Sequence, residues 1–231
     1  MSDEQDTTGG SDTTGGSDTT GGSDTAGGSD KAGGSGNAGG GARSPVLDRH
    51  GEALDLFGDR VHAVRADQWD APTPCADWTV RDLVNHLTAE QLWVPALVRD
   101  GATVESVGDA FDGDVLGPDP VTSWDTAAAP ARAAFQEPGA LDRTVNLSFG
   151  ATAATFYCGQ MTTDLVVHAW DLSRAIGADE TLPEPLVAFA LREVSPYAAE
   201  LEKSGLFAPA VEPPADADEQ TKLLNLLGRR V

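Results

Sequence analysis

The stretch TTDLVVHAWDLSRAIG, residues Thr162–Gly177, decides most of what the sequence predicts about the fold. Drawn as a helix, it has apolar residues around more than half of its girth, and its final glycine suits a helix end. Asp164, His168 and Asp171 project within about 60° of one another on this helix. Such a polar line is either the solvent face of an amphipathic helix or part of a metal site, because an acid and a histidine four residues apart project from adjacent turns.

Helical spacing of apolar residues recurs along most of the chain after residue 45. A loop is expected over residues 101–119, and a short extended piece or hairpin over 141–150. Several long helices with little extended structure indicate an all-α bundle with long crossover connections at 101–119 and 139–150 and an added C-terminal helical segment. The predicted helices are 46–66, 80–101, 120–139 (kinked or divided at Pro130), 151–176, 184–205 and 218–228.

The first 45 residues differ in composition from the rest of the chain. Residues 5–40 consist of hexads such as SDTTGG, whose glycine, serine, threonine and aspartate cannot bury enough apolar surface to offset chain entropy. We therefore predict that residues 1–45 are a disordered tail and that residues 46–231 form one domain.

The chain is strongly acidic, with a formal net charge of −22 at pH 7. A surface of this sign disfavours binding to nucleic acid or to anionic membranes. No apolar run approaches the length of a membrane span, and the N-terminus lacks the pattern of a signal peptide. The two cysteines have no metal-type spacing and indicate no disulfide framework. We expect a cytoplasmic protein with reduced thiols that binds a small molecule or a thiol, as a monomer or a homodimer.

A metal site on the 151–176 helix needs a third ligand from elsewhere, since two ligands do not make a stable site. The best candidate is His86, at the border of the apolar stripe on a helix that Thr79 is expected to cap. His50 and His62 lie among charged neighbours and are expected at the surface. The residues alone leave the metal site and the solvent face as open alternatives.

The cysteines are weaker candidates for a functional role. Cys158 falls on the apolar sector of its helix, which favours a small core residue over a nucleophile. Cys75 lies in the proline-broken loop before the 80–101 helix, where an ordinary loop residue is favoured over a functional thiol.

Two motifs together resemble one known family. WDAPTPCADWTVRDLVNHL (69–87) and DLVVHAWDLSRAIG (164–177) resemble the mycothiol-dependent maleylpyruvate isomerase N-terminal domain family, a member of the DinB-like superfamily of metal-binding four-helix bundles. The C-terminal LFAPAVEPPADADEQTKLLNLLG (206–228) resembles a shorter, uncharacterised branch of that family.

The resemblance implies a divalent metal ion, typically zinc, held by His86, Asp164 and His168. The isomerase pattern has glutamate where this chain has Asp164, a shorter side chain that still supplies an oxygen ligand. Asp171 is then expected behind the ligands or on the helix surface, and Trp170 beside the site as a packing residue. We expect the extra C-terminal domain of the isomerase to be absent, which disfavours maleylpyruvate itself as the substrate.

Three functions remain in competition. The first is a metal-dependent transferase or isomerase that acts with a low-molecular-weight thiol, whose sulfur the metal would hold as a thiolate. The alternative is a non-catalytic protein that binds a metal or a small ligand. A third is a structural or interaction domain, in which His86 and His168 would lie more than about 5 Å apart, since zinc–nitrogen bonds are about 2 Å long.

Overall fold

The computed structural model describes residues 44–198, 201 and 208–231. The chain divides into two units, Met1–Gly41 and Ala42–Val231, and only the second contains described residues. The predicted tail, residues 1–45, therefore lies outside the described part apart from its last two residues. The end of the predicted 184–205 helix falls largely outside it as well.

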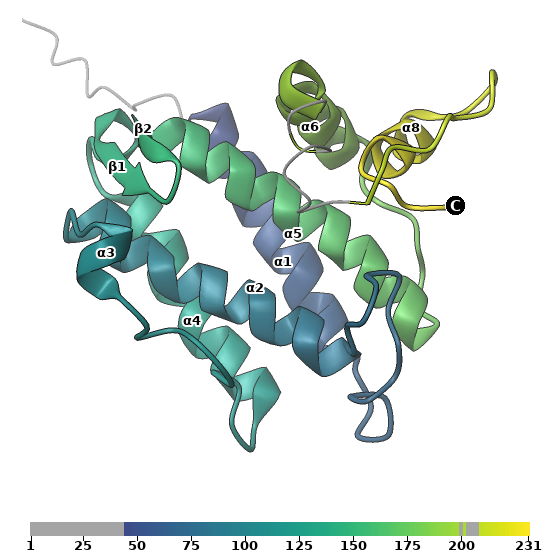
Figure 1. Ribbon diagram of the computed structural model, residues 1–231, viewed down its shortest axis with the longest axis horizontal. Helices are drawn as coiled ribbons and strands as arrows, with labels where there is room; N and C mark the ends of the chain where they lie inside the picture. Colours follow the sequence, from purple (N-terminus) through teal and green to yellow (C-terminus); the bar gives the residue numbers. More distant parts are fainter. Residues whose placement is uncertain (1–43, 199–200, 202–207) are drawn as a thin grey trace, which may run out of the picture. The chain divides into compact units, whose positions relative to one another are not determined.

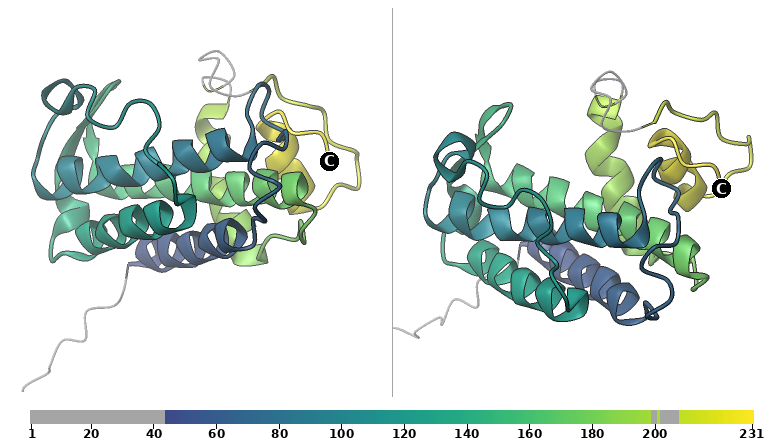
Figure 2. Two further views of the ribbon diagram at one scale, coloured as in Figure 1. Left: turned by 90° about the horizontal axis from the view of Figure 1, so that it is seen from below. Right: turned by 60° about the horizontal axis from the view of Figure 1, so that its bottom comes forward.

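Four long helices form the bundle that the apolar spacing predicts (Figures 1 and 2). Helix α1 packs against both α4 and α5, and α2 packs against the same two helices. Helix α6 covers part of α5, and α8 in turn packs against α6. The bounds are α1 Pro45–His62, α2 Val80–Val94, α4 Pro120–Gln136, α5 Ala154–Ile176, α6 Glu184–Val194 and α8 Glu219–Leu226.

Three connections refine the predicted boundaries. The 101–119 loop contains one short helix, α3, at Val104–Val107. A β-hairpin precedes α5, with β1 at Thr144–Leu147 paired antiparallel to β2 at Gly150–Ala153. Helix α5 consequently begins three residues later than predicted, because the second strand uses the residues assigned to its first turn. Helix α2 continues into a π-helical turn over Pro95–Arg99.

Pro130 neither divides nor ends α4, which runs through it as one helix. Its ring is exposed, so water can satisfy the carbonyl of Thr126 that loses its helical donor. The buried side of α4, which includes Trp124 and Phe135, is thereby kept intact.

Apolar side chains form two buried clusters in the bundle. The larger joins α1, α2 and α5 to α6 and α8, and Trp170 is fully buried within it, as its predicted packing role requires. The smaller surrounds Phe135 and includes Cys158, which has no exposed surface. Burial raises the pKa of the Cys158 thiol to about 12, so this cysteine is a protonated core residue, as predicted.

The prediction of a surface position is wrong for His50 and right for His62. His50 is fully buried against Phe135, and its Nδ1 lies 3.3 Å from the guanidinium of Arg132. Arg132 can approach because residue 51 is glycine, where a Cβ atom would lie 2.6 Å from the guanidinium. Desolvation and the adjacent Arg132 lower the pKa of His50 to about 3, so the buried imidazole is neutral.

Thr79 caps α2 as predicted, in a reciprocal capping box with Asp82. Replacing Thr79 with alanine removes the acceptor for the Asp82 backbone N–H and is expected to lower the free energy of unfolding by about 1 kcal/mol. Urea denaturation measures this change. Thr103→Ala is the control, since Thr103 caps only the four-residue α3, and its effect should be smaller. Equal effects would contradict a role for the Thr79 cap in bundle stability.

Among the helices of the described residues, none has both the length and the apolar character needed to cross a membrane.

Candidate metal centre

The polar line of α5 faces α2 rather than solvent. Asp171 is fully buried, His168 is 5% exposed, and the side chain of Asp164 is 23% exposed. Cys75, just before α2, contacts Asp171, whereas His86, further along α2, contacts Asp164. The two helices are therefore antiparallel along this line, and the solvent-face interpretation of the α5 pattern is wrong.

The structure brings together the three residues predicted as metal ligands. Asp164 lies between the two imidazoles, with Oδ2 3.3 Å from His86 Nε2 and Oδ1 3.4 Å from His168 Nε2. One donor atom from each residue lies within 4.8 Å of the other two. This proximity disfavours the purely structural interpretation, which required a greater separation of the two histidines.

The charges of these groups depend on one another. Burial by itself would raise the pKa of Asp164, but the imidazoles of His168 and His86 outweigh it and hold the pKa well below its usual range. Burial would lower the pKa of His168, yet the carboxylates of Asp164 and Asp171 raise it well above its usual value. A divalent ion bound at Nε2 of His168 would have to displace any proton held there.

A second group of polar side chains lies behind His168. Asp171 Oδ2 accepts a hydrogen bond of 2.9 Å from His168 Nδ1 and another of 2.8 Å from Arg229. The thiol of Cys75 donates to the same carboxylate at 3.3 Å. Burial would raise the pKa of Asp171, but His168 and Arg229 together hold it at about 2. Of the two positions predicted for Asp171, the one on the helix surface is therefore wrong, since Asp171 is buried behind His168.

Trp78 and Glu90 complete the surroundings of the three donors. The Trp78 ring is stacked on His168 at 5.9 Å between centroids and lies 5.0 Å from the ring of His86. Glu90 is one helical turn beyond His86, and burial together with the charge of Asp164 raises its pKa.

Sequence reasoning missed these neighbours for different reasons. The four-residue spacing from His86 could have placed Glu90 on the same helix face. The sequence favours an ordinary loop residue at Cys75. In the structure, the Cys75 thiol contacts Asp171 and lies 3.8 Å from His168 Nδ1. Arg229 contacts Asp171, which lies 58 positions earlier in the sequence, and no pattern of neighbouring residues predicts such a contact.

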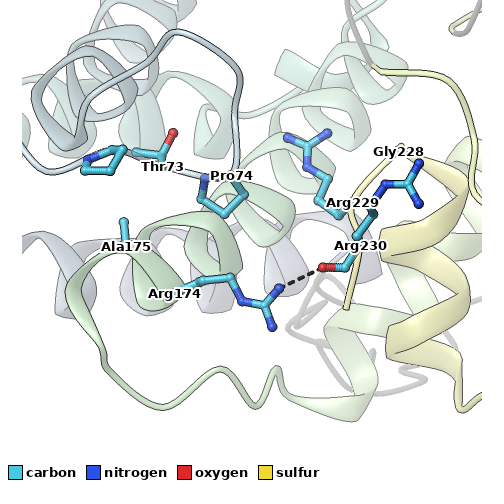
Figure 3. Close-up of a pocket in the computed structure, with 8 residues that line it drawn as sticks. Thr73, Pro74, Arg174, Ala175, Gly228, Arg229 and Arg230 are labelled. Carbon is cyan, nitrogen blue, oxygen red and sulfur yellow. Dashed lines mark hydrogen bonds between the residues drawn. The ribbon is translucent and has the colours of Figure 1, made fainter.

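A pocket of about 560 Å³ opens beside Arg229, between residues 72–74, the end of α5 and residues 228–230. Figure 3 shows Arg174 reaching the main-chain oxygen of Arg230, while the side chain of Arg229 points away from Arg174. Arg174 is also paired with Glu180 at 3.1 Å, and Arg229 with Asp171. Both arginines thus have acidic partners, so the arrangement is a poor anion site.

Comparisons with known proteins identify the family of this chain. Residues 50–173 match the model of the mycothiol maleylpyruvate isomerase N-terminal domain family. Two uncharacterized proteins of Mycobacterium tuberculosis, from strains CDC 1551 / Oshkosh and ATCC 25618 / H37Rv, are each 33% identical over 141 residues, which is 59% of this chain and 70% of theirs.

Solved structures show the same fold. Crystal structures of the mycothiol-dependent maleylpyruvate isomerase and of a mutant of it match with TM-scores of 0.55 and 0.54 at 17% and 14% identity. Each match covers 67% of this chain and 70% of the other, and confirms the predicted DinB-like bundle. Because the family model spans more than half of the chain and includes His86, Asp164 and His168, this chain belongs to the mycothiol maleylpyruvate isomerase N-terminal domain family.

Proposed function

We propose that this protein binds one divalent metal ion, zinc above others, through His86, Asp164 and His168, and acts there on a low-molecular-weight thiol in a transferase or isomerase reaction. The observation that carries the proposal is the convergence of these three donors from two helices within 4.8 Å. Membership of a family named for a mycothiol-dependent isomerase supports the thiol.

The residues present fit a zinc ion. Two imidazole nitrogens and one carboxylate oxygen are a donor set that zinc takes in catalytic sites. Asp164 presents a different oxygen to each histidine, Oδ2 at 3.3 Å from His86 Nε2 and Oδ1 at 3.4 Å from His168 Nε2. Each separation equals that of neighbouring ligands with zinc bonds of about 2.0–2.1 Å in tetrahedral arrangement. The shorter arm of aspartate at position 164 therefore still reaches both histidines.

When bound at three protein ligands, zinc supplies a positive charge that favours the thiolate form of a sulfur ligand in its remaining position. The residues of the chain prepare the site for it. Asp171 accepts the Nδ1 proton of His168, which leaves Nε2 to face Asp164. The Trp78 ring packs against both histidines. Glu90, with its raised pKa, is suited to exchange a proton with a bound molecule.

Elemental analysis of the purified full chain tests the metal. We expect one divalent ion per chain in the wild type and none in His86→Ala. His62→Ala is the matched control, because His62 is exposed and pairs with Asp125, and it should retain the ion. A wild-type chain without a stoichiometric ion would refute the proposal.

The thiol is tested on the cobalt-substituted chain. Adding mycothiol should produce the near-ultraviolet absorption of a cobalt–thiolate bond, and a methyl thioether of the same thiol should not produce it. A chain that holds cobalt but gives no such absorption would instead favour the non-catalytic alternative, with a ligand sphere closed by the protein. Glu90 is the residue to test as the closing ligand in that case.

A further inference from the structure

We infer that Arg229, in the C-terminal segment beyond the matched family region, is a positioning residue that holds His168 in its metal-binding orientation through Asp171. Metal affinity would then depend on a segment that supplies no ligand. The inference rests on the proposed function, since it concerns the same metal site.

The main chain around Arg229 is built to place this residue. Helix α8 is followed by Gly228, whose φ of +79° is left-handed and where a Cβ atom would collide with the carbonyl of Ala208. The backbone N–H of Arg229 donates to the Leu224 carbonyl at 2.8 Å, and its own carbonyl accepts from the side chain of Asn225 at 2.8 Å. Asn225 is itself buried, so hydrogen bonds at both the backbone N–H and the carbonyl of Arg229 fix the turn.

The guanidinium of Arg229 is buried and contacts the carboxylate of Asp171 through two of its nitrogens. Its Nε lies 3.3 Å from Oδ1, and one terminal nitrogen lies 2.8 Å from Oδ2. The other terminal nitrogen donates to the Leu227 carbonyl at 2.8 Å. Arg229 is 9% exposed and Asp171 is not exposed at all. A two-pronged contact of this kind fixes the plane of a carboxylate, which a single contact does not.

The orientation of the Asp171 carboxylate in turn fixes the orientation of the His168 ring. An ionised carboxylate only accepts hydrogen bonds, so the proton in the 2.9 Å contact belongs to His168 Nδ1. The opposite nitrogen, Nε2, then faces Asp164 at 3.4 Å, where a metal ion would bind. Without Arg229, Cys75 would still contact Oδ2 of Asp171, but Oδ1 would lose the contact that fixes the plane of the carboxylate, and the acceptor of His168 would be held less firmly.

A second metal site is the competing interpretation of this cluster. Cys75, His168 and Asp171 also have donor atoms within 4.8 Å of one another. However, the guanidinium of Arg229 lies 2.8 Å from Asp171 and 3.6 Å from the Cys75 sulfur. A cationic side chain already neutralises this group, so a second cation there would have to displace it.

Zinc affinity of the full chain tests the inference, measured by competition with a chromogenic chelator. Arg229→Met should weaken zinc binding about 10- to 100-fold, the usual effect of losing a group that orients a ligand. Arg229→Lys should restore part of the affinity, since lysine keeps the charge but not the planar fork. Arg230→Met is the matched control, because the Arg230 side chain is exposed and Arg230 contacts Arg174 through its main-chain oxygen, and it should bind zinc as the wild type does.

Two further measurements separate positioning from general damage. In the zinc-bound chain, nitrogen-15 NMR should show the Nδ1–H signal of His168 in wild type and in Arg229→Lys, and its loss or displacement in Arg229→Met. The double variant Asp171→Asn/Arg229→Met should bind zinc no more weakly than Asp171→Asn alone, because both changes act through one contact.

The outcomes distinguish this inference from the function on which it rests. If the wild type binds zinc and Arg229→Met binds it equally tightly, the positioning role is wrong and the proposed function stands. If the wild type binds no zinc, both are overturned. Should Arg229→Met fail to fold, Arg229→Lys decides, and wild-type affinity in that variant would overturn the inference.

Discussion

Replacing His168 with alanine is expected to abolish stoichiometric binding of a divalent metal ion, and with it any thiol-dependent activity. The imidazole lies 3.4 Å from Asp164, and its loss leaves two of the three donors. The loss of affinity should exceed the roughly 10- to 100-fold effect of removing an orienting group. The variant should still fold, because Asp171 keeps its pairing with Arg229 and alanine favours helix.

Elemental analysis and a zinc titration measure this effect, with circular dichroism to verify folding. Gln160→Ala is the control, since Gln160 lies on the same face of α5 but outside the group of donors. It should bind zinc as the wild type does. A folded His168→Ala chain that retains one ion would show that the metal is held elsewhere.

Acid is expected to destabilise the fold through His50 as the pH falls below about 6.5. The pKa of His50 is about 3 in the folded chain and 6.5 when unperturbed. Between these values the unfolded chain binds a proton that the folded chain does not, so stability is present above about pH 6.5 and falls as the pH falls. At about 1.4 kcal/mol per pH unit, the loss at pH 4 is on the order of 3 kcal/mol.

Urea denaturation of wild type and His50→Gln at pH 7, 6, 5 and 4 isolates this contribution. Glutamine keeps an acceptor for Arg132 but cannot be protonated, so its unfolding free energy should fall less steeply with acid. The stability difference between the two chains should therefore shrink as the pH falls. His62→Gln, an exposed position, should keep the wild-type slope. Parallel slopes for wild type and His50→Gln would exclude the buried imidazole as the cause.

The spacing of apolar residues predicted the helices well, because each long helix buries one apolar stripe whose residues are close together in the sequence. The same spacing could not predict which residues cover the polar line of α5. Asp171 is buried because Arg229, distant in sequence, supplies the opposite charge. The spacing of Asp164 and His168 showed that they share a face, whereas the approach of His86 depends on how α2 packs. Metal binding by these three residues stays a prediction.

His50 shows the same limit for the core. Its charged sequence neighbours predicted a surface position, but burial was decided by Arg132 and Phe135 on a different helix. Cys158 was predicted correctly because it lies on the apolar sector of its own helix, which packs into the cluster around Phe135. Residues whose burial follows from the apolar sector of their own helix could thus be placed from sequence, and those whose burial depends on a specific polar partner across the bundle could not.

The position of Arg229 has a practical consequence for producing the protein. Only Arg230 and Val231 would separate an affinity tag fused after Val231 from Arg229, whose side chain is paired with Asp171. A polyhistidine tag there would add competing imidazoles close to the turn at Gly228, and zinc measured on such a chain could not be attributed to His86, Asp164 and His168. An N-terminal tag is separated from the unit that starts at Ala42 by the whole preceding repeat sequence, and is the appropriate choice for every metal measurement proposed above.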